Sequence, residues 1–173
     1  PAAPGATIRL MRRILLGACL AVASLQAQKQ PFTVERLLEL QRISEHELSP
    51  DGTQVAFTVQ TVNVEANTKP RQIWVVPLAG GAPRKLTSDG NNYRPKWSAD
   101  GKSLAFISTR SGSAQVWLMN ADGSGARQVT NISTEADAVS FVPGGNKIVF
   151  LSEVFPECTN DACNKAKLEA ESK

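Results

Sequence analysis

The sequence has little of the chemistry on which most enzymes depend. Its 173 residues include one histidine, one tyrosine and three cysteines, and aromatic residues make up 6%. The Gly-x-Ser-x-Gly pattern that carries the nucleophile of α/β-hydrolases does not occur. His46 cannot complete a Ser-His-Asp triad, because no positioned serine or aspartate accompanies it. We therefore expect no catalytic residue within this sequence.

Phosphate-binding glycine loops are also missing. Gly101-Lys102-Ser103 resembles the end of a P-loop, but Lys96 stands where the first glycine is required. The stretch Gly123-Ser124-Gly125 lacks the third glycine of a dinucleotide loop. We expect a hairpin turn at the first of these sites and no cofactor at either.

An excess of positive charge is absent from most of the chain. The formal net charge is +3, but three of the 19 basic residues lie before residue 28, where there is no acidic residue. The 16 basic and 16 acidic residues that remain cancel. Because nucleic-acid-binding domains carry a basic footprint, the balance excludes a nucleic acid as the expected partner.

A hydrophobic run long enough to span a bilayer is missing as well. Met11 and two arginines precede an apolar run from Ile14 to Leu25, which has the length of a secretory signal. We predict cleavage after Ala27, an exported protein and no stable membrane insertion after cleavage. Leu16 to Cys19 resembles a lipoprotein box, so lipidation of Cys19 is the alternative that we favour less.

What the chain does contain is a repeat. Three segments align, and each ends in phenylalanine: LSPDGTQVAF ends at Phe57, WSADGKSLAF at Phe106 and FVPGGNKIVF at Phe150. A Gln-x-Trp motif follows the first two, with Trp74 and Trp117 43 residues apart. The first copy has a six-residue insertion around residues 62–70, and its removal leaves a period of about 43.

A period near 43 with four strand-sized runs is typical of β-propeller blades. The Asp-Gly pairs at Asp51 and Asp100 predict type I′ hairpin turns. The runs that follow them are apolar on both faces, as expected for strands covered on both sides by neighbouring blades. We accordingly interpret Trp74 and Trp117 as inter-blade packing residues rather than a ligand-stacking pair.

The predicted fold is all-β: a partial propeller of four-stranded antiparallel blades, with about two and a half blades present. Propellers close with about four to eight blades, so we expect the chain to be the beginning of a longer protein. The expected layout is the following: residues 1–27, upstream residues and signal; residues 28–42, entry segment; residues 43–154, incomplete propeller with blades at 43–87, 93–130 and 136–154; residues 155–173, cysteine-containing loop and helix-prone tail.

The flanking segments suggest a helix and a disulfide. Residues 33–41 suit a short helix capped by Thr33, which we expect to pack on the propeller as a strap. Cys158 and Cys163 lie five residues apart in a polar loop and most simply form a disulfide in an exported protein. Free thiols are the main alternative. A zinc site would need two further ligands, so we expect no metal.

The tail and one loop also allow specific expectations. Residues 161–173 are helix-prone, with Lys165–Glu169 and Lys167–Glu171 spaced for i,i+4 ion pairs. Asn131-Ile132-Ser133 matches a glycosylation sequon, but we interpret it as a loop between blades.

These features resemble a family. The order of segments is similar to the start of secreted bacterial prolyl oligopeptidase family members, in the acylaminoacyl-peptidase and dipeptidyl-peptidase-like branch. The segments are a signal peptide, PFTVERLLELQRISEHELSPDGTQVAFTV, two blade motifs and then FPECTNDACNKAKLE. The resemblance covers residues 31–173. It implies a propeller that admits short peptides to a C-terminal α/β-hydrolase domain with a Ser-Asp-His triad. No glutamate here matches the pair that holds the substrate amino terminus in the dipeptidyl branch.

Two functions remain open at the level of sequence. One is the gating propeller of a secreted serine peptidase, with peptides and the hydrolase domain of the same chain as its partners. The other is a non-enzymatic periplasmic propeller of TolB type that binds proteins. TolB-like proteins carry a separate domain before the propeller, and about sixteen residues between the cleavage site and the first strand are too few for one. That argument favours the peptidase.

Overall fold

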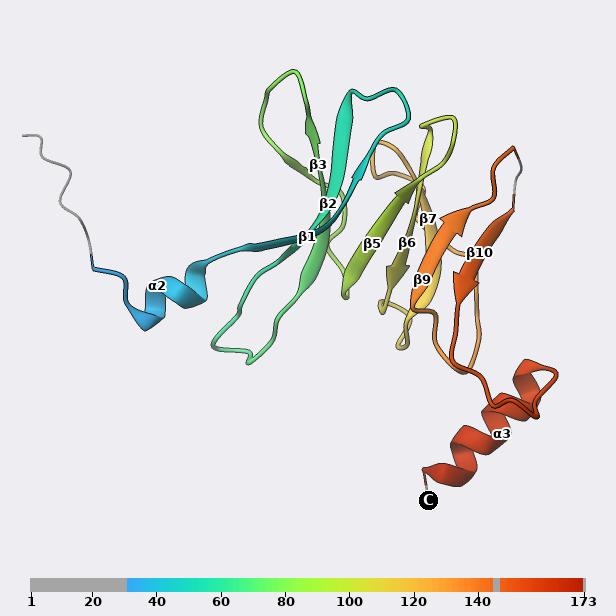
Figure 1. The fold of residues 1–173 in the computed structure, drawn as a ribbon. Coiled ribbons are helices and arrows are strands. Elements are labelled where there is room, and N and C mark those ends of the chain that lie inside the picture. The colour runs from blue at the N-terminus through green and yellow to red at the C-terminus, as the bar shows by residue number, and fades with distance from the viewer. Residues whose placement is uncertain (1–30, 145–146, 173) are drawn as a thin grey trace, which may run out of the picture. The chain divides into compact units, whose positions relative to one another are not determined.

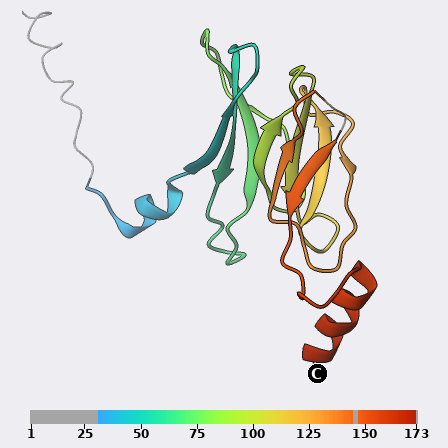
Figure 2. The same ribbon diagram turned by 45° about the vertical axis from the view of Figure 1, so that its right-hand side comes forward.

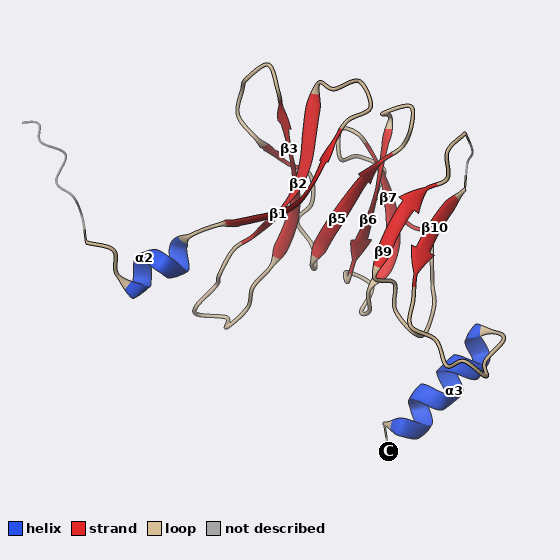
Figure 3. Ribbon diagram, viewed as in Figure 1, coloured by secondary structure: helices blue, strands red, loops and turns tan. Residues whose placement is uncertain are grey.

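The computed structural model describes residues 31–144 and 147–172. The predicted signal segment, Cys19 and the cleavage site after Ala27 lie outside the described residues. Within them, ten strands form three antiparallel sheets, and two short helices flank the strands (Figures 1 and 3). Contacts divide the chain into two units, residues 1–34 and 35–173, and all the sheets belong to the second. No described helix is long and apolar enough to cross a membrane.

Each sheet is a meander in which every strand pairs with the next. The first sheet has the order β1-β2-β3-β4, the second β5-β6-β7-β8, and the third pairs β9 with β10. The strands are β1 (Arg42–Leu48), β2 (Gln54–Gln60), β3 (Arg71–Pro77), β4 (Arg84–Lys85), β5 (Asn92–Trp97), β6 (Ser103–Ser108), β7 (Gln115–Asn120), β8 (Arg127–Gln128), β9 (Ala138–Phe141) and β10 (Ile148–Leu151).

The sequence repeat is a structural repeat. Phe57 pairs with Trp74 in the first sheet, and Phe106 pairs with Trp117 at the equivalent position of the second. The prediction of four-stranded antiparallel blades in a partial propeller is confirmed. The insertion in the first copy lengthens the β2–β3 hairpin, which the Asn63–Thr68 bridge closes.

The turns between the first two strands of each sheet differ from the prediction. A type I′ turn needs two consecutive residues with positive φ, but only the glycines have it: φ is 69° at both Gly52 and Gly101. The aspartate before each glycine keeps a negative φ because its carboxylate accepts the N–H two residues later, from Thr53 to Asp51 and from Lys102 to Asp100. These are therefore aspartate-braced turns, and the I′ assignment was wrong.

Two hydrophobic cores lie between successive sheets. The first contains Ala56, Ile73, Val75, Trp97, Leu104, Phe106 and Met119, and the second contains Tyr93, Ala105, Ile107, Ala114, Val116, Ala136 and Val139. Strand β6 therefore contributes alternate residues to both cores, as its apolar sequence predicted. Trp117 packs against the first core, whereas neither core includes Trp74. The inter-blade role holds for Trp117.

The sheets converge along their first strands. Backbone contacts join β1 to β5 and β5 to β9. Trp97 Nε1 also donates to the carbonyl of Glu47 at 3.2 Å, which ties β5 to β1. In a propeller, the strands that converge in this way surround the central channel.

Both irregular connections leave the sheets at the same end. The β2–β3 hairpin and the segment that leads from β10 into α3 (Asp161–Glu171) lie opposite the Asp-Gly turns in both ribbon views (Figures 1 and 2). Each connection follows the second strand of its sheet, so the repeat explains why they share an end.

Helix α2 (Val34–Glu39) forms where the sequence predicts a helix, but it buries none of its residues. Leu37 and Leu38 are 45% and 37% exposed. Among the described residues the helix does not pack as a strap on the sheets, so that expectation stays a prediction.

Candidate functional site

Five charged residues in or directly before the first strands join the sheets, and we call this set the charge ladder: Glu45, Glu47, Arg94, Lys96 and Asp137. Its position follows from the repeat. Strands β1 and β5 each have a register shift, between Ser44 and Glu47 in one and between Tyr93 and Lys96 in the other. The two bulges lie at equivalent places in the wall formed by the first strands.

The bulges place Glu45 and Arg94 in an unusual backbone conformation. Their φ angles are 51° and 55°, in the left-handed region that non-glycine residues rarely adopt. Such a conformation costs of order 1–3 kcal/mol and persists where surrounding contacts enforce it. A β-bulge redirects a side chain. We attribute the contact between Glu45 and Arg94 of neighbouring strands to this effect.

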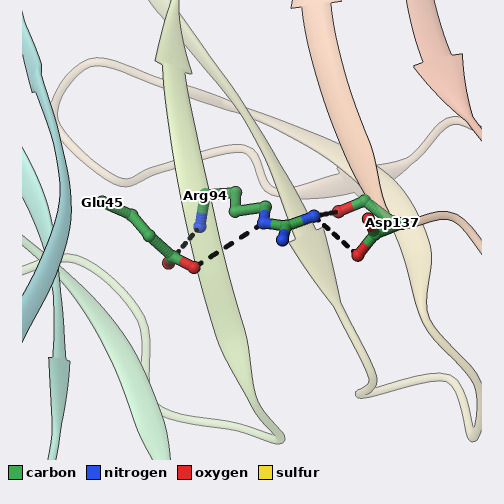
Figure 4. Close-up of polar contacts among 3 residues, drawn as sticks. All are labelled: Glu45, Arg94 and Asp137. Carbon is green, nitrogen blue, oxygen red and sulfur yellow. Dashed lines mark hydrogen bonds and ion pairs between the residues drawn. The ribbon is translucent and has the colours of Figure 1, made fainter.

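Arg94 connects all three sheets (Figure 4). Its backbone N–H donates to Glu45 Oε2 at 3.0 Å, and its Nε lies 3.7 Å from Glu45 Oε1. On the other side, Nη1 donates to the backbone carbonyl of Asp137 and lies 2.6 Å from its Oδ1. A single side chain in β5 thus links β1 to the residue that precedes β9.

The electrostatics of the ladder favour a fixed, charged guanidinium. The hydrogen bond to Asp137 raises the pKa of Arg94 above its ordinary value, and burial opposes that rise. Asp137 is 66% exposed, so solvent screens the pair and its contribution to stability is about 1 kcal/mol or less. The hydrogen bond from the Arg94 N–H to Glu45 and the packing of the strands also hold Arg94 in place.

A second ion pair joins β1 to β5. Lys96 Nζ lies 2.6 Å from Glu47 Oε2. With three carboxylates and two cations, the ladder has a formal charge of −1. Its groups pair with one another across the sheets and form a polar surface along the first strands.

The ladder offers no arrangement for acid–base or nucleophilic chemistry. His46 lies in β1, inside the strand region where the sequence placed it, and its side chain is exposed. Among the described residues, no group of three or more His, Cys, Asp or Glu side chains is placed to hold a metal ion.

The disulfide-bridged arm, residues 155–171, adjoins the third sheet. Cys158 and Cys163 are joined by an S–S bond, with their Cα atoms 5.4 Å apart. Asn160 caps α3 by accepting the N–H of Cys163. Asp161 accepts both the N–H of Ser133, at 2.8 Å, and its hydroxyl. The sequon therefore lies in the loop between β8 and β9, as expected, and that loop anchors the arm.

The ion pairs expected along α3 are replaced by a different one. Lys167 contacts Glu157 in the loop before the helix, and its ammonium lies 5.4 Å from the centre of the Phe155 ring. The Lys167 contact lowers the pKa of Glu157. The loop before α3 folds back on the helix, so Lys167 pairs with Glu157 of that loop and not with Glu171. The i,i+4 prediction was therefore wrong for this lysine.

The ladder was not recognised from the sequence, although a signal for it exists. When the repeats are aligned on Leu48 and Trp97, Glu45 falls on Arg94 and Glu47 falls on Lys96. Opposite charges at equivalent positions of adjacent repeats become neighbours when the repeats stack. Tabulating charge at equivalent positions, and not only apolar identity, would have found two of its three contacts.

Comparison with protein families gives a match over most of the sheets. The model described as TolB beta propeller domain matches residues 41–166. The uncharacterized peptidase YuxL of Bacillus subtilis is 30% identical over 123 residues, which is 70% of this chain and 19% of YuxL. Dipeptidyl-peptidase 5 of Porphyromonas gingivalis is 38% identical over 86 residues, 49% of this chain and 13% of that peptidase. The chain thus spans less than a fifth of these two relatives.

Solved structures share the fold. The AtxE2 isopeptidase superposes with a TM-score of 0.64 at 21% identity, over 82% of this chain and 25% of the isopeptidase. A protein from Agrobacterium tumefaciens described as a TolB superposes with a TM-score of 0.56 at 28% identity, over 70% of this chain and 42% of that protein. Similarity therefore extends to peptidases and to TolB-type proteins.

Proposed function

The chain belongs to the TolB β-propeller domain family, and from this we propose that it is the substrate-gating propeller of a secreted serine peptidase that hydrolyses short peptides. The observation that carries the proposal is the similarity to the peptidase YuxL over 70% of the chain. In this proposal the nucleophile belongs to an α/β-hydrolase domain with a Ser-Asp-His triad, outside these 173 residues. The propeller excludes folded proteins from the active site and supplies no catalytic residue.

The geometry of the first strands supports a gating role. They converge on one another, and the charge ladder fixes their spacing through Arg94. A wall held in this way keeps the channel narrow. A narrow channel admits an extended peptide, rejects a folded protein by size and holds back bulk water from the enclosed site. The exposed carboxylate of Asp137 gives an entering peptide a hydrogen-bond acceptor.

The expected layout belongs to the same proposal. Residues 1–27 would be removed on export, residues 28–42 would form the entry segment, residues 43–154 would form the first blades, and residues 155–173 would lead onward. The exported protein would be periplasmic or secreted. N-terminal sequencing of the exported protein should give Gln28 as the first residue, whereas lipidation would leave Cys19 at the mature terminus.

The test is hydrolysis by the complete protein. We expect it to cleave aminoacyl or dipeptidyl chromogenic substrates and to be labelled by a fluorophosphonate on one serine beyond residue 173. The 173-residue chain should be neither active nor labelled. Turnover by the 173-residue chain alone, or no labelling of the complete protein, would overturn the proposal.

A second function is favoured by the TolB-type relatives. The Tol-Pal system protein TolB of Anaeromyxobacter dehalogenans is 43% identical over 82 residues, 47% of this chain and 18% of that protein. On this reading the propeller is a scaffold that binds proteins. The gene downstream distinguishes the two: a Gly-x-Ser-x-Gly followed by Asp and His indicates the peptidase, and a stop after six or seven blades indicates the scaffold.

A further inference from the structure

The sequence has four steps at which an aspartate precedes a glycine, and their aspartates are Asp51, Asp89, Asp100 and Asp122. Such steps are prone to isomerise, because glycine has no side chain to shield its amide nitrogen from the neighbouring carboxyl group. All four aspartates are exposed. Since exposure and the following residue are alike at the four steps, their local contacts decide which of them reacts.

Three of the four carboxylates are held by a serine hydroxyl. In each case the two oxygens lie 2.6 Å apart, and the pairs are Ser49 with Asp51, Ser98 with Asp100, and Ser124 with Asp122. The backbone N–H two residues after each of these aspartates donates to the same carboxylate, at 2.8 to 3.1 Å. These bonds keep the carboxylate on the N–H two residues ahead. They must break before the carboxyl group can turn to the glycine nitrogen.

The glycine N–H groups at the same three steps are engaged as well. Each donates to the carbonyl three residues earlier, and the pairs are Gly52 with Ser49 at 2.9 Å, Gly101 with Ser98 at 2.9 Å, and Gly123 with Asn120 at 2.8 Å. The nitrogen that would attack the carboxyl carbon is therefore committed to its turn. Both reacting groups are restrained at these steps.

The step from Asp89 to Gly90 has neither restraint. Among the described residues, no hydroxyl or N–H donates to the Asp89 carboxylate, and the N–H of Gly90 donates to no acceptor. Arg110 attracts the carboxylate through its charge without forming an ion pair with it. The φ of Gly90 is 67°, close to the 69° of Gly52. The conformation of the glycine is thus similar, and the missing hydrogen bonds distinguish this step.

Protonation adds to the difference. Ring closure needs a protonated carboxyl group, because its hydroxyl leaves as water. The serine hydroxyls lower the pKa of Asp51, Asp100 and Asp122 below the ordinary value of 3.8. At neutral pH these three groups are therefore protonated less often than an unrestrained aspartate, which slows the reaction at their steps further.

We propose that Asp89 is the site at which this part of the chain forms isoaspartate. The Gly90 nitrogen loses its proton and bonds to the carboxyl carbon of Asp89, whose hydroxyl leaves as water, so that a succinimide ring forms. Water then adds to one of the two ring carbonyls and breaks its bond to the nitrogen. One product is aspartate again, and the other is isoaspartate, whose backbone runs through the side-chain carboxyl carbon. The proposal does not depend on the proposed peptidase function.

Isoaspartate at this step would disturb the joint between the first two sheets. Asn92 donates its amide to the carbonyl of Asp89 at 2.8 Å, and Gln72 donates to the carbonyl of Gly90 at 2.9 Å. Both donor side chains are buried. The isomer lengthens the backbone by one methylene and displaces these carbonyls. Gly90 cannot move toward Arg110 to compensate, because a Cβ on Gly90 would already lie 2.8 Å from the Arg110 nitrogen.

The test follows the four steps in the complete folded protein, kept at neutral pH in water enriched in oxygen-18. Each passage through the succinimide leaves one heavy oxygen, which mass spectrometry of the proteolytic peptides detects, and electron-transfer fragmentation identifies isoaspartate. We expect the reaction at Asp89 to be about tenfold or more faster than at each of the other three, since their hydrogen bonds must break first. An equal or slower reaction at Asp89 would overturn the proposal.

Unfolding and substitution provide the controls. In guanidinium chloride the four rates should converge, and an unchanged preference for Asp89 would show that the fold does not set it. Ser98→Ala should speed the reaction at Asp100 and leave Asp89 unchanged, and no change at Asp100 would contradict the restraint assigned to the serine. Asp89→Glu should stop the reaction at this step, because its side chain would have to close a less favourable six-membered ring.

The structural consequence has its own readout. After prolonged incubation the wild-type protein should contain a fraction with a lower Tm, and that fraction should be the one that carries isoaspartate at residue 89. The Asp89→Glu protein should keep its original Tm through the same incubation. An isoaspartate fraction that unfolds at the wild-type Tm would contradict the effect expected on the joint between the sheets.

Discussion

The backbone N–H of Arg94 donates to the carboxylate of Glu45, and these two residues occupy equivalent bulges in adjacent sheets. Both have positive φ. The same local distortion therefore presents an acceptor in one sheet and a donor in the next. The same bulge recurs in β1 and β5, with glutamate in one and arginine in the other. Two similar sequences can therefore form a donor–acceptor contact between adjacent sheets.

The Glu45 contact yields the first prediction. Glu45→Gln keeps an oxygen for the N–H of Arg94 and loses only the screened ion pair, so it should lower the free energy of unfolding by less than about 1 kcal/mol. Glu45→Ala leaves the N–H without its acceptor and should cost about 1–3 kcal/mol. Urea denaturation of both variants measures the difference. Equal losses would show that the carboxylate charge, not the N–H bond, carries the contact.

The second prediction concerns two glycines with nearly equal φ. Gly90 and Gly52 have φ of 67° and 69°. A Cβ at Gly90 would lie 2.8 Å from the backbone nitrogen of Arg110, whereas a Cβ at Gly52 would meet nothing within 4 Å. Gly52→Ala should therefore cost only the backbone strain, of order 1–2 kcal/mol. Gly90→Ala should cost clearly more, because the backbone around Arg110 must shift. Thermal unfolding of the two variants tests this, and equal shifts in Tm would contradict it.

The buried glutamine of the Gln-x-Trp motif supports a third prediction. Gln115 is 1% exposed, its oxygen accepts from Thr130 and from the N–H of Ile132, and its nitrogen donates to the carbonyl of Ile132. Gln115→Ala should lower the free energy of unfolding by about 2–4 kcal/mol, since it leaves buried polar groups without partners. Gln54→Ala, at the half-buried start of β2, is the control and should cost less than about 0.5 kcal/mol. Similar costs would remove the structural role assigned to the motif.

The Asp-Gly turns predict a pH effect. The hydroxyl of Ser98 and then the N–H of Lys102 lower the pKa of Asp100 below its ordinary value of 3.8. A carboxyl with a lowered pKa stabilises the folded state above its unfolded pKa, and this stabilisation is lost as the pH falls through the folded pKa. Ser98→Ala should therefore raise the pKa of Asp100 toward 3.8. Carbon-13 NMR titration of the carboxyl carbon measures it, with Ser111→Ala as the control that leaves the titration in place.

The parts of this fold that the sequence predicted are those that its repeat encodes locally. The apolar runs ending at Phe57 and Phe106, the Gln-x-Trp strands and the hairpin insertion each reappear in the structure, because period and strand length follow from short stretches of chain. The turn type was missed because side-chain bonds of Asp51 and Asp100 replaced the second positive φ.

The charge ladder lay beyond that local information. Arg94 and Glu45 are 49 residues apart, and their contact exists only once the sheets have stacked. The pairing of Lys167 with Glu157 likewise depends on how the loop before α3 folds back. Neither follows from helical or strand periodicity. Two ladder contacts can be found only by comparing charges across the repeats, and the Lys167–Glu157 pair required coordinates.

The most direct test of the proposed gate is substrate length. The complete protein would be given a series of unstructured peptides with the same cleavable end, from about 4 to 40 residues, together with the same end attached to a folded domain. The account predicts that kcat/KM falls steeply once the substrate is too long or too compact for the channel, and that the folded substrate is not cleaved. A kcat/KM that does not change along the series, with the folded substrate cleaved at the same rate, would contradict it.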